Sequence, residues 1–182
     1  KSFIQFIESG NAIKGLSRIN QENVKGTLQD IYKRLLPKIG VSVKDTALLG
    51  GTGKKNPGGT SGDIDLAIEI GALMKAYNEV KYNTVIDTLV GKVKPLVDQT
   101  FLSRGTGIFT VEWPISNDDG LQPNEMVQLD LMIVDSLKFA DFAFWSPHES
   151  ESKYKGVYRS FVLFAILKNS SMYRQGDKKP VQ

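Results

Sequence analysis

The sequence predicts a mixed α/β or α+β fold, in which a mixed β-sheet is flanked by helices. Three observations support this class. Apolar residues recur with helical spacing between Asn20 and Ile39. The segments Asp63 to Ile70 and Met126 to Val134 have the length and apolar content of buried strands, although each contains aspartate. Helical and strand patterns also follow one another along the chain, which is typical of a sheet covered by helices.

The first helix is expected to start at Asn20, a common N-cap residue, and to stop at Gly40. Its apolar face consists of Val24, Leu28, Ile31, Leu35 and Ile39. The other expected elements are, in order, a short strand at 47–51, a glycine- and lysine-rich loop at 53–62, a strand at 63–70, helices at 71–80 and 83–93, strands at 97–102 and 107–115, a polar loop at 117–124, a strand at 126–134, and helices at 136–145 and 154–167. The expected core residues of the last helix are Val157, Phe161, Phe164 and Ile166.

Length and composition set the frame for the function. A chain of 182 residues favours a single domain, with a core at about 20–168 and a loose basic tail at 169–182. The formal net charge of +3 permits contact with nucleic acid without requiring it. Cysteine is absent, which excludes disulfides and thiolate chemistry and favours a cytoplasmic or other intracellular location. No apolar run is long enough for a membrane span, so no membrane partner is expected.

The most informative residues form an acidic pair, Asp63 and Asp65, in the strand that contains Ile64 and Leu66. Residues i and i+2 of a strand face the same side, so the two carboxylates should project together while Ile64 and Leu66 enter the core. Two like charges at the edge of a core are costly unless a cation neutralises them. The simplest candidate is a divalent cation that prefers oxygen ligands, with Mg²⁺ as the first choice.

A third carboxylate extends this pattern. Asp130 is the single acid in the apolar run Val127 to Ile133, where a lone buried aspartate would be costly. If this strand lies beside the acidic pair, the three carboxylates form a cage for two Mg²⁺ ions, with Mn²⁺ as an alternative. The turn Gly50-Gly51-Thr52 precedes the acidic pair and would let the backbone approach a phosphate. Together these features indicate a phosphoryl- or nucleotidyl-transfer site.

These residues resemble the motifs of the DNA polymerase beta-like nucleotidyltransferase superfamily. That pattern has a glycine turn at the end of a strand, an Asp-x-Asp strand about a dozen residues later, and a third aspartate on a separate strand. The resemblance covers roughly residues 48–133. It implies a nucleotidyltransferase-like catalytic domain that transfers a nucleoside monophosphate from an NTP to a hydroxyl group and releases pyrophosphate. The segment 145–159 is also similar to nucleotidyltransferase-like proteins of large bacteriophages, which would fit a viral origin.

The resemblance also implies roles for single residues. Gly50 and Gly51 would let the backbone approach the nucleotide, and Thr52 would meet the β- and γ-phosphates. The family more often has serine where Thr52 stands, and threonine keeps the hydroxyl. The acidic pair would bind both cations. Asp130 would bind the cation nearer the attacking group and accept the proton of the hydroxyl.

Four basic residues are candidates for contact with phosphate: Lys54 and Lys55 in the glycine-rich loop, and Lys155 and Arg159 in the last helix. Lys155 and Arg159 are four residues apart and therefore share a helix face. The alternative for each is an ordinary solvated side chain. The basic late helix and tail favour the end of an RNA or a DNA as the acceptor. A further domain or a partner protein is expected to help to recognise it.

Two other functions stay open at this point. The same fold could form a non-catalytic module that binds nucleotide or nucleic acid. The same three acids could also serve a metal-dependent phosphohydrolase, which needs no acceptor. Fold and acidic cage alone do not choose among these functions.

Overall fold

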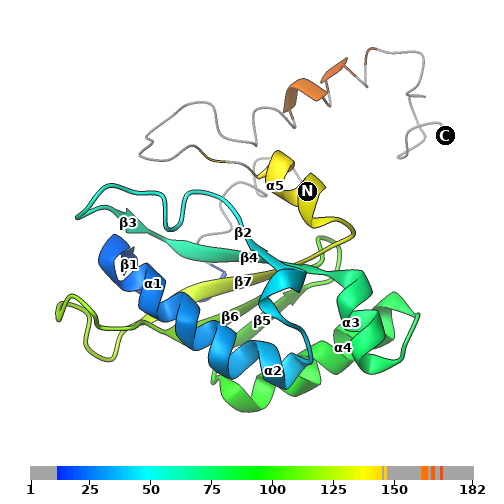
Figure 1. The fold of residues 1–182 in the computed structure, drawn as a ribbon, viewed down its shortest axis with the longest axis horizontal. Helices are drawn as coiled ribbons and strands as arrows, with labels where there is room; N and C mark the ends of the chain where they lie inside the picture. Colours follow the sequence, from blue (N-terminus) through cyan, green and yellow to red (C-terminus); the bar gives the residue numbers. More distant parts are fainter. Residues whose placement is uncertain (1–11, 145, 147–160, 164, 167–168, 170–182) are drawn as a thin grey trace.

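The computed structural model describes residues 12–144, 146, 161–163, 165–166 and 169 (Figure 1). Its centre is a five-stranded sheet in the order β2-β4-β7-β6-β5, and β1 and β3 form a separate two-stranded ribbon. The strands are β1 (Ile19–Asn20), β2 (Thr46–Leu48), β3 (Thr60–Ser61), β4 (Asp63–Glu69), β5 (Thr100–Ser103), β6 (Ile108–Pro114) and β7 (Met126–Val134). Strands β4 and β7 are parallel, whereas the other pairs are antiparallel. The predicted α+β class with a mixed sheet is confirmed.

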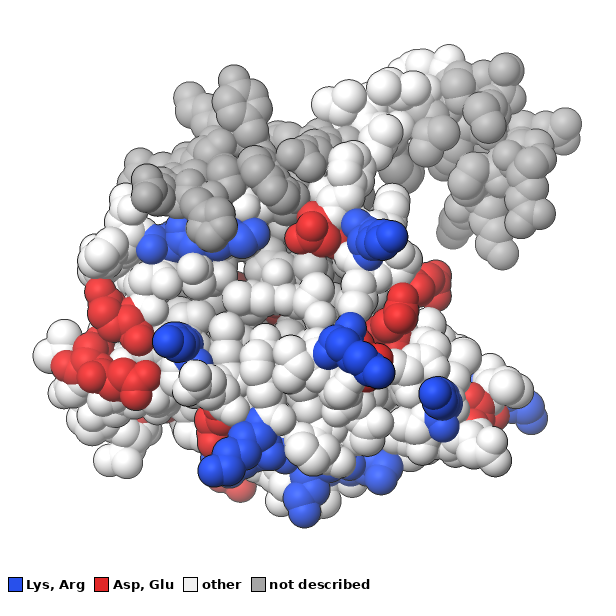
Figure 2. Space-filling model, in the orientation of Figure 1, with Lys and Arg blue, Asp and Glu red and all other residues white. Residues whose placement is uncertain are grey.

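Helices cover both faces of the large sheet, but unequally. The helices are α1 (Gln21–Asp30), α2 (Leu36–Ile39), α3 (Ile70–Tyr77), α4 (Tyr82–Val93) and α5 (Leu137–Ala143). The first four share one hydrophobic core with one face of the sheet, and α5 packs on the opposite face. Figures 1 and 2 view the side on which α1 and α2 lie in front of the sheet. On that side the described basic and acidic side chains are interspersed rather than gathered by sign (Figure 2).

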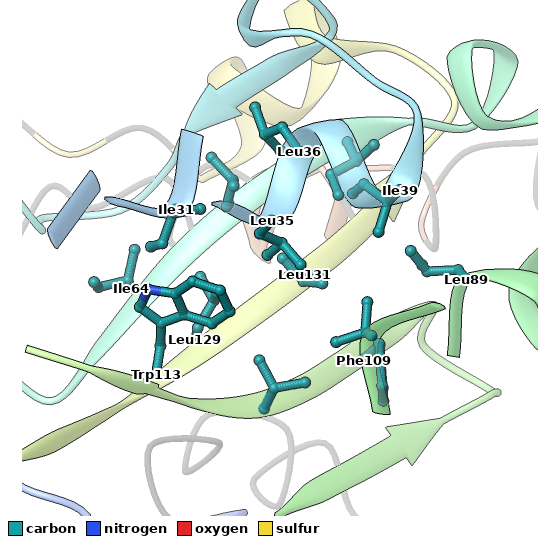
Figure 3. Close-up of a cluster of buried hydrophobic side chains, with 14 of the residues drawn as sticks. Ile31, Leu35, Leu36, Ile39, Ile64, Leu89, Phe109, Trp113, Leu129 and Leu131 are labelled. Carbon is teal, nitrogen blue, oxygen red and sulfur yellow. The ribbon is translucent and has the colours of Figure 1, made fainter. Parts of the chain in front are cut away.

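The alternation of side chains along β4 explains the two faces. Ile64 and Leu66 are fully buried in the core under the first four helices, as predicted. Ala67 faces the other way and packs against Met132 and Ala140 under α5. The core side chains labelled in Figure 3 are Ile31, Leu35, Leu36, Ile39, Ile64, Leu89, Phe109, Trp113, Leu129 and Leu131. The first face is therefore a conventional apolar layer, and the acids of β4 project from the second face.

The predicted first helix is present but contains a π-helical turn over Ile31–Leu35. Pro37 lies near the start of α2 and has no backbone N–H, so a regular α-helix at this point would lose a hydrogen bond and meet the proline ring. The π turn absorbs the irregularity, and the N–H of Leu36 donates to the carbonyl of Ile31. Gly40 ends the helix with a φ of 76°, as the sequence predicted.

Several predicted boundaries need correction. The strand predicted at 47–51 ends at Leu48, because Gly50 and Gly53 adopt φ values of 66° and 78° in a turn. The predicted loop at 53–62 contains the two-residue strand β3, which pairs with β1. The strand predicted to start at residue 97 starts at Thr100, after a 3₁₀ turn over Lys94–Leu96.

The last predicted helix falls largely outside the described residues. Residues 161–163 and 165–166 are helical, in agreement with the prediction. Phe161 is partly buried, but Ile166 is 59% exposed, so its assignment to the core is wrong. An amphipathic pattern leads to burial only where another element covers the apolar face, and Val162 and Leu163 are exposed there too. Val157, Phe164 and almost all of the predicted tail lie outside the described residues.

Candidate functional site

The structure brings Asp63, Asp65 and Asp130 together on the second face of the sheet. Each contributes a carboxylate oxygen, and these oxygens lie within 4.8 Å of one another. The reason is the parallel ladder between β4 and β7, in which Asp65 is directly opposite Asp130. Asp63 is two residues earlier on β4 and faces the same side. The three acids proposed from the sequence therefore form one cluster.

This cluster belongs to a polar patch that spans three strands. One row across the sheet consists of Asp65, Asp130 and Thr110, and the next row consists of Asp63, Gln128 and Glu112. Asp63 and Asp65 are partly buried, whereas the other four residues are buried. The neighbouring row on the same face is apolar, with Ala67 and Met132 packed under α5. On the second face, the apolar row of Ala67 and Met132 is therefore directly next to the polar row of Asp65 and Asp130.

The electrostatics of the cluster are unfavourable without a cation. Burial and the nearby charges of Asp63 and Asp130 raise the pKa of Asp65 to about 8. Burial also raises the pKa of Asp130, and hydrogen bonds from Thr110 and Gln128 act in the opposite direction. No hydrogen bond from another described residue lowers the pKa of Asp65. Burial and two neighbouring carboxylates therefore both oppose the ionisation of Asp65.

Asp130 accepts hydrogen bonds from two buried side chains. The Thr110 hydroxyl donates to Oδ1 of Asp130 over 2.6 Å. The side-chain amide of Gln128 donates to Oδ2 over 3.1 Å and to Oδ1 over 3.3 Å. Asp130 is only 1% exposed, so these bonds replace the water that its carboxylate loses on burial.

Glu112 lies in the polar patch, but its carboxylate accepts hydrogen bonds from residues just before β5. Its Oε1 accepts hydrogen bonds from the backbone N–H groups of Asp98 and Gln99, at 2.9 and 2.8 Å. Its Oε2 accepts a third bond from the Gln99 side chain at 3.1 Å. This carboxylate therefore holds the chain that leads into β5, and it is not part of the cluster of three acids.

The glycine turn lies directly beside the acids. Gly50 has a φ of 66°, and a Cβ at this position would lie 3.0 Å from Oδ2 of Asp65. Both observations favour glycine, which tolerates positive φ and has no side chain to collide with the carboxylate. The Gly50 N–H donates to the carbonyl of Phe144 over 3.1 Å, which ties the turn to the end of α5. The Thr52 hydroxyl donates to the backbone carbonyl of Asp63 over 2.8 Å and so links the turn to β4.

Of the four basic candidates, two lie in the described part of the chain. The Lys55 ammonium lies 3.5 Å from the position that a Cβ on Gly51 would occupy, so it stands beside the glycine turn. The Lys54 ammonium donates to the backbone carbonyl of Ser146 over 3.0 Å, which engages it with the segment after α5. Lys155 and Arg159 lie outside the described residues.

The donor set fits a hard divalent cation. Carboxylate oxygens are the preferred ligands of Mg²⁺ and Mn²⁺, whereas zinc sites usually contain histidine or cysteine. The cluster contains neither of these residues. A bound dication would also offset the repulsion that raises the pKa of Asp65. Asp63, Asp65 and Asp130 are therefore chemically suited to such an ion.

Sequence reasoning missed Thr110 and Gln128. A signal for Gln128 was present, because it lies two residues before Asp130 in an apolar strand and must share its face. Thr110 gave no such signal, because its place beside Asp130 depends on the β6–β7 register. That register joins residues 20 positions apart in the chain.

Comparison with known proteins adds no assignment. A scan against protein-family models found no match to this chain, and no curated protein matched it significantly.

Proposed function

We propose that this protein is a divalent-metal-dependent nucleotidyltransferase, which transfers a nucleoside monophosphate from an NTP to a hydroxyl group. One observation carries the proposal: three carboxylates with oxygens within 4.8 Å of one another, beside a turn in which Gly50 closely approaches Asp65. A metal cage next to a backbone turn that can meet phosphates suits phosphoryl chemistry, in which positioning and charge neutralisation supply most of the catalysis.

In this proposal Asp63, Asp65 and Asp130 hold two Mg²⁺ ions, and Mn²⁺ can replace them. Bound dications would neutralise the triphosphate and make an attacking hydroxyl easier to deprotonate. The acids come from adjacent strands of one sheet, so the backbone ladder fixes their spacing. A rigid scaffold of this kind suits a site that must be formed before its substrate arrives.

The glycine turn would hold the phosphates. The backbone N–H groups of Gly51 and Thr52 donate no hydrogen bond to any described residue, which supports a role in contact with an anion. The Thr52 hydroxyl is already engaged with Asp63, and its N–H is therefore the better candidate for phosphate contact. Lys55 would add a positive charge beside the turn. Lys54, Lys155 and Arg159 complete the proposed phosphate contacts.

The proposed reaction is a single displacement at the α-phosphorus of the NTP. The acceptor oxygen forms a bond to the α-phosphorus of the NTP and gives its proton to the Asp130 carboxylate. The bond between the α-phosphorus and the oxygen that bridges to the β-phosphate breaks. Pyrophosphate leaves with that electron pair, and the acceptor keeps the nucleoside monophosphate.

The acceptor that we propose is the hydroxyl end of an RNA or a DNA. Figure 2 shows no continuous basic track over the described residues of the side on which α1 and α2 lie, and the acids project from the opposite face. A further domain or a partner protein would then supply acceptor recognition. None of the helices in the described part of the chain has the length and apolar character of a bilayer span.

A product assay tests the proposal. The protein is incubated with α-labelled NTPs, Mg²⁺ or Mn²⁺, and a panel of RNA, DNA and protein acceptors. The wild type should label an acceptor and release pyrophosphate, whereas Asp63→Ala should lose transfer and an Asp45→Asn control should retain it. Equal transfer by wild type and Asp63→Ala would exclude this mechanism. NTP binding without product would favour the non-catalytic module, and release of nucleoside monophosphate without an acceptor would favour the phosphohydrolase.

A further inference from the structure

The hydrogen bonds on Asp130 come from two side chains of the sheet. Thr110 stands on β6, which is the neighbour of β7 on the side away from β4. Gln128 stands on β7 itself, two residues before Asp130. Asp63 and Asp65 stand on β4, on the opposite side of β7. Neither donor therefore stands on the strand that carries the acidic pair.

Both donors are themselves fixed. Thr110 is 2% exposed and lies directly opposite Asp130 in the β6–β7 ladder. Gln128 is 1% exposed, and its side-chain carbonyl accepts a hydrogen bond from the backbone N–H of Ala12 over 3.1 Å. That bond orients the amide of Gln128 so that its NH₂ group faces Asp130. A chain of contacts thus runs from the segment before β1 to the carboxylate.

We propose that Thr110 and Gln128 are positioning residues, which aim the Asp130 carboxylate at the acidic pair and thereby set the affinity for a divalent cation. This inference rests on the metal site of the proposed function. A carboxylate has about four acceptor positions, so the three bonds from these two side chains can fix its plane and still leave one position for a cation. Supporting bonds to metal ligands commonly change affinity about 10- to 100-fold.

The test measures Mn²⁺ binding alone, without nucleotide, from the electron paramagnetic resonance signal of free Mn²⁺. Thr110→Val keeps the shape of the side chain but removes the donor, and should weaken Mn²⁺ binding about 10- to 100-fold. Thr110→Ser keeps a hydroxyl and should bind within about threefold of the wild type. Gln128→Met removes the second donor at similar volume and should also weaken binding.

A matched control separates positioning from general loss of stability. Thr27 is fully buried in α1, and its hydroxyl donates to the carbonyl of Asn23 and accepts from the N–H of Ser116. Its helix, α1, packs on the face of the sheet opposite to the acids. Thr27→Val should lower the melting temperature but leave Mn²⁺ affinity unchanged. Equal Mn²⁺ affinity in Thr110→Val and wild type, or an equal loss in Thr27→Val, would overturn the inference.

The same measurements distinguish this inference from the proposed function. Tight Mn²⁺ binding that Thr110→Val weakens, with no nucleotidyl product from the wild type, supports the positioning role and refutes the transferase. Transfer by the wild type with unchanged Mn²⁺ affinity in Thr110→Val refutes only the positioning role. Failure of the wild type to bind Mn²⁺ refutes both.

Discussion

Replacing Asp65 by Asn should stabilise the metal-free protein, and the gain should grow as the pH rises from about 5 to about 8. Burial and the charges of Asp63 and Asp130 raise the pKa of Asp65 to about 8 in the folded protein, against roughly 3.9 in an unfolded chain. Between these two values the folded state keeps a proton that the unfolded state releases. Wild-type stability therefore falls as the pH rises through this window. Asparagine has no such proton, so this contribution disappears in the variant.

The size of the effect follows from the pKa difference. Each pH unit inside the window is worth at most about 1.4 kcal/mol. The free energy of unfolding of Asp65→Asn, relative to the wild type, should therefore rise by about 2 to 4 kcal/mol between pH 5 and pH 8. The lower figure allows for the part of the Asp65 side chain that remains in contact with water.

The assay is urea unfolding in EDTA at several pH values, followed by tryptophan fluorescence, since Trp113 is fully buried. Asp45→Asn is the control, because hydrogen bonds from Ser42 lower the pKa of Asp45 below its ordinary value. Asp45 is ionised in both states throughout this pH range, and the difference between its variant and the wild type should stay constant.

Parallel pH curves for the wild type and Asp65→Asn would refute this reasoning, and so would a wild type that gains stability relative to the variant as the pH rises. A second arm of the experiment adds Mg²⁺. A dication that binds the ionised acids should stabilise the wild type by about 1.4 kcal/mol at ten times its dissociation constant, and more strongly at high pH. Asp65→Asn should respond little, and an equal response in both proteins would argue against a cation at this cluster.

Three further predictions follow from individual contacts. Gly50→Ala and Gly58→Ala should each lower the free energy of unfolding by about 1 kcal/mol, because both glycines have positive φ. Gly50→Ala alone should also reduce Mg²⁺ binding, since only there would the new Cβ crowd a carboxylate; isothermal titration calorimetry checks this, and equal binding by both variants would contradict it. Gly91→Ala should raise the free energy of unfolding by about 0.5–1 kcal/mol, because its Cβ would meet open space in α4. Gly26→Ala should gain less than Gly91→Ala, because its Cβ would displace two side chains of the loop after β6, and thermal unfolding compares the two variants. Lys55→Met should raise the KM for NTP more than it lowers kcat if its ammonium meets phosphate, and an unchanged KM would remove this lysine from the site.

The sequence predicted the acidic cluster well because strand alternation and apolar flanks are local signals. Asp63 and Asp65 had to share a face, and β7 matched its predicted bounds of Met126–Val134. Their convergence with Asp130 depended on a single further assumption, that β4 and β7 are neighbours. The ladder between them meets that assumption.

Features that depend on long-range contact could not be predicted in the same way. The two-residue strands β1 and β3 are too short to show any periodicity. The engagement of Lys54 with Ser146 and of Thr110 with Asp130 needs the tertiary arrangement. For Ile166 the helix was predicted correctly but the burial was not. A helical pattern does not show whether another element covers its apolar face.

The in-register pairing of β4 with β7 also has a consequence for how the chain finds its native alignment. A shift of β7 by one residue relative to β4 would turn the Asp130 side chain toward the hydrophobic core. The same shift would turn Leu129 and Leu131 away from that core. Each such error would be penalised by several kcal/mol, because an ionised carboxylate would be stranded among hydrocarbon. The residues that we assign to chemistry therefore also act as a check against misalignment while the sheet assembles. Variants that lack these acids should tolerate wrongly paired strands more readily, even where their finished fold is more stable.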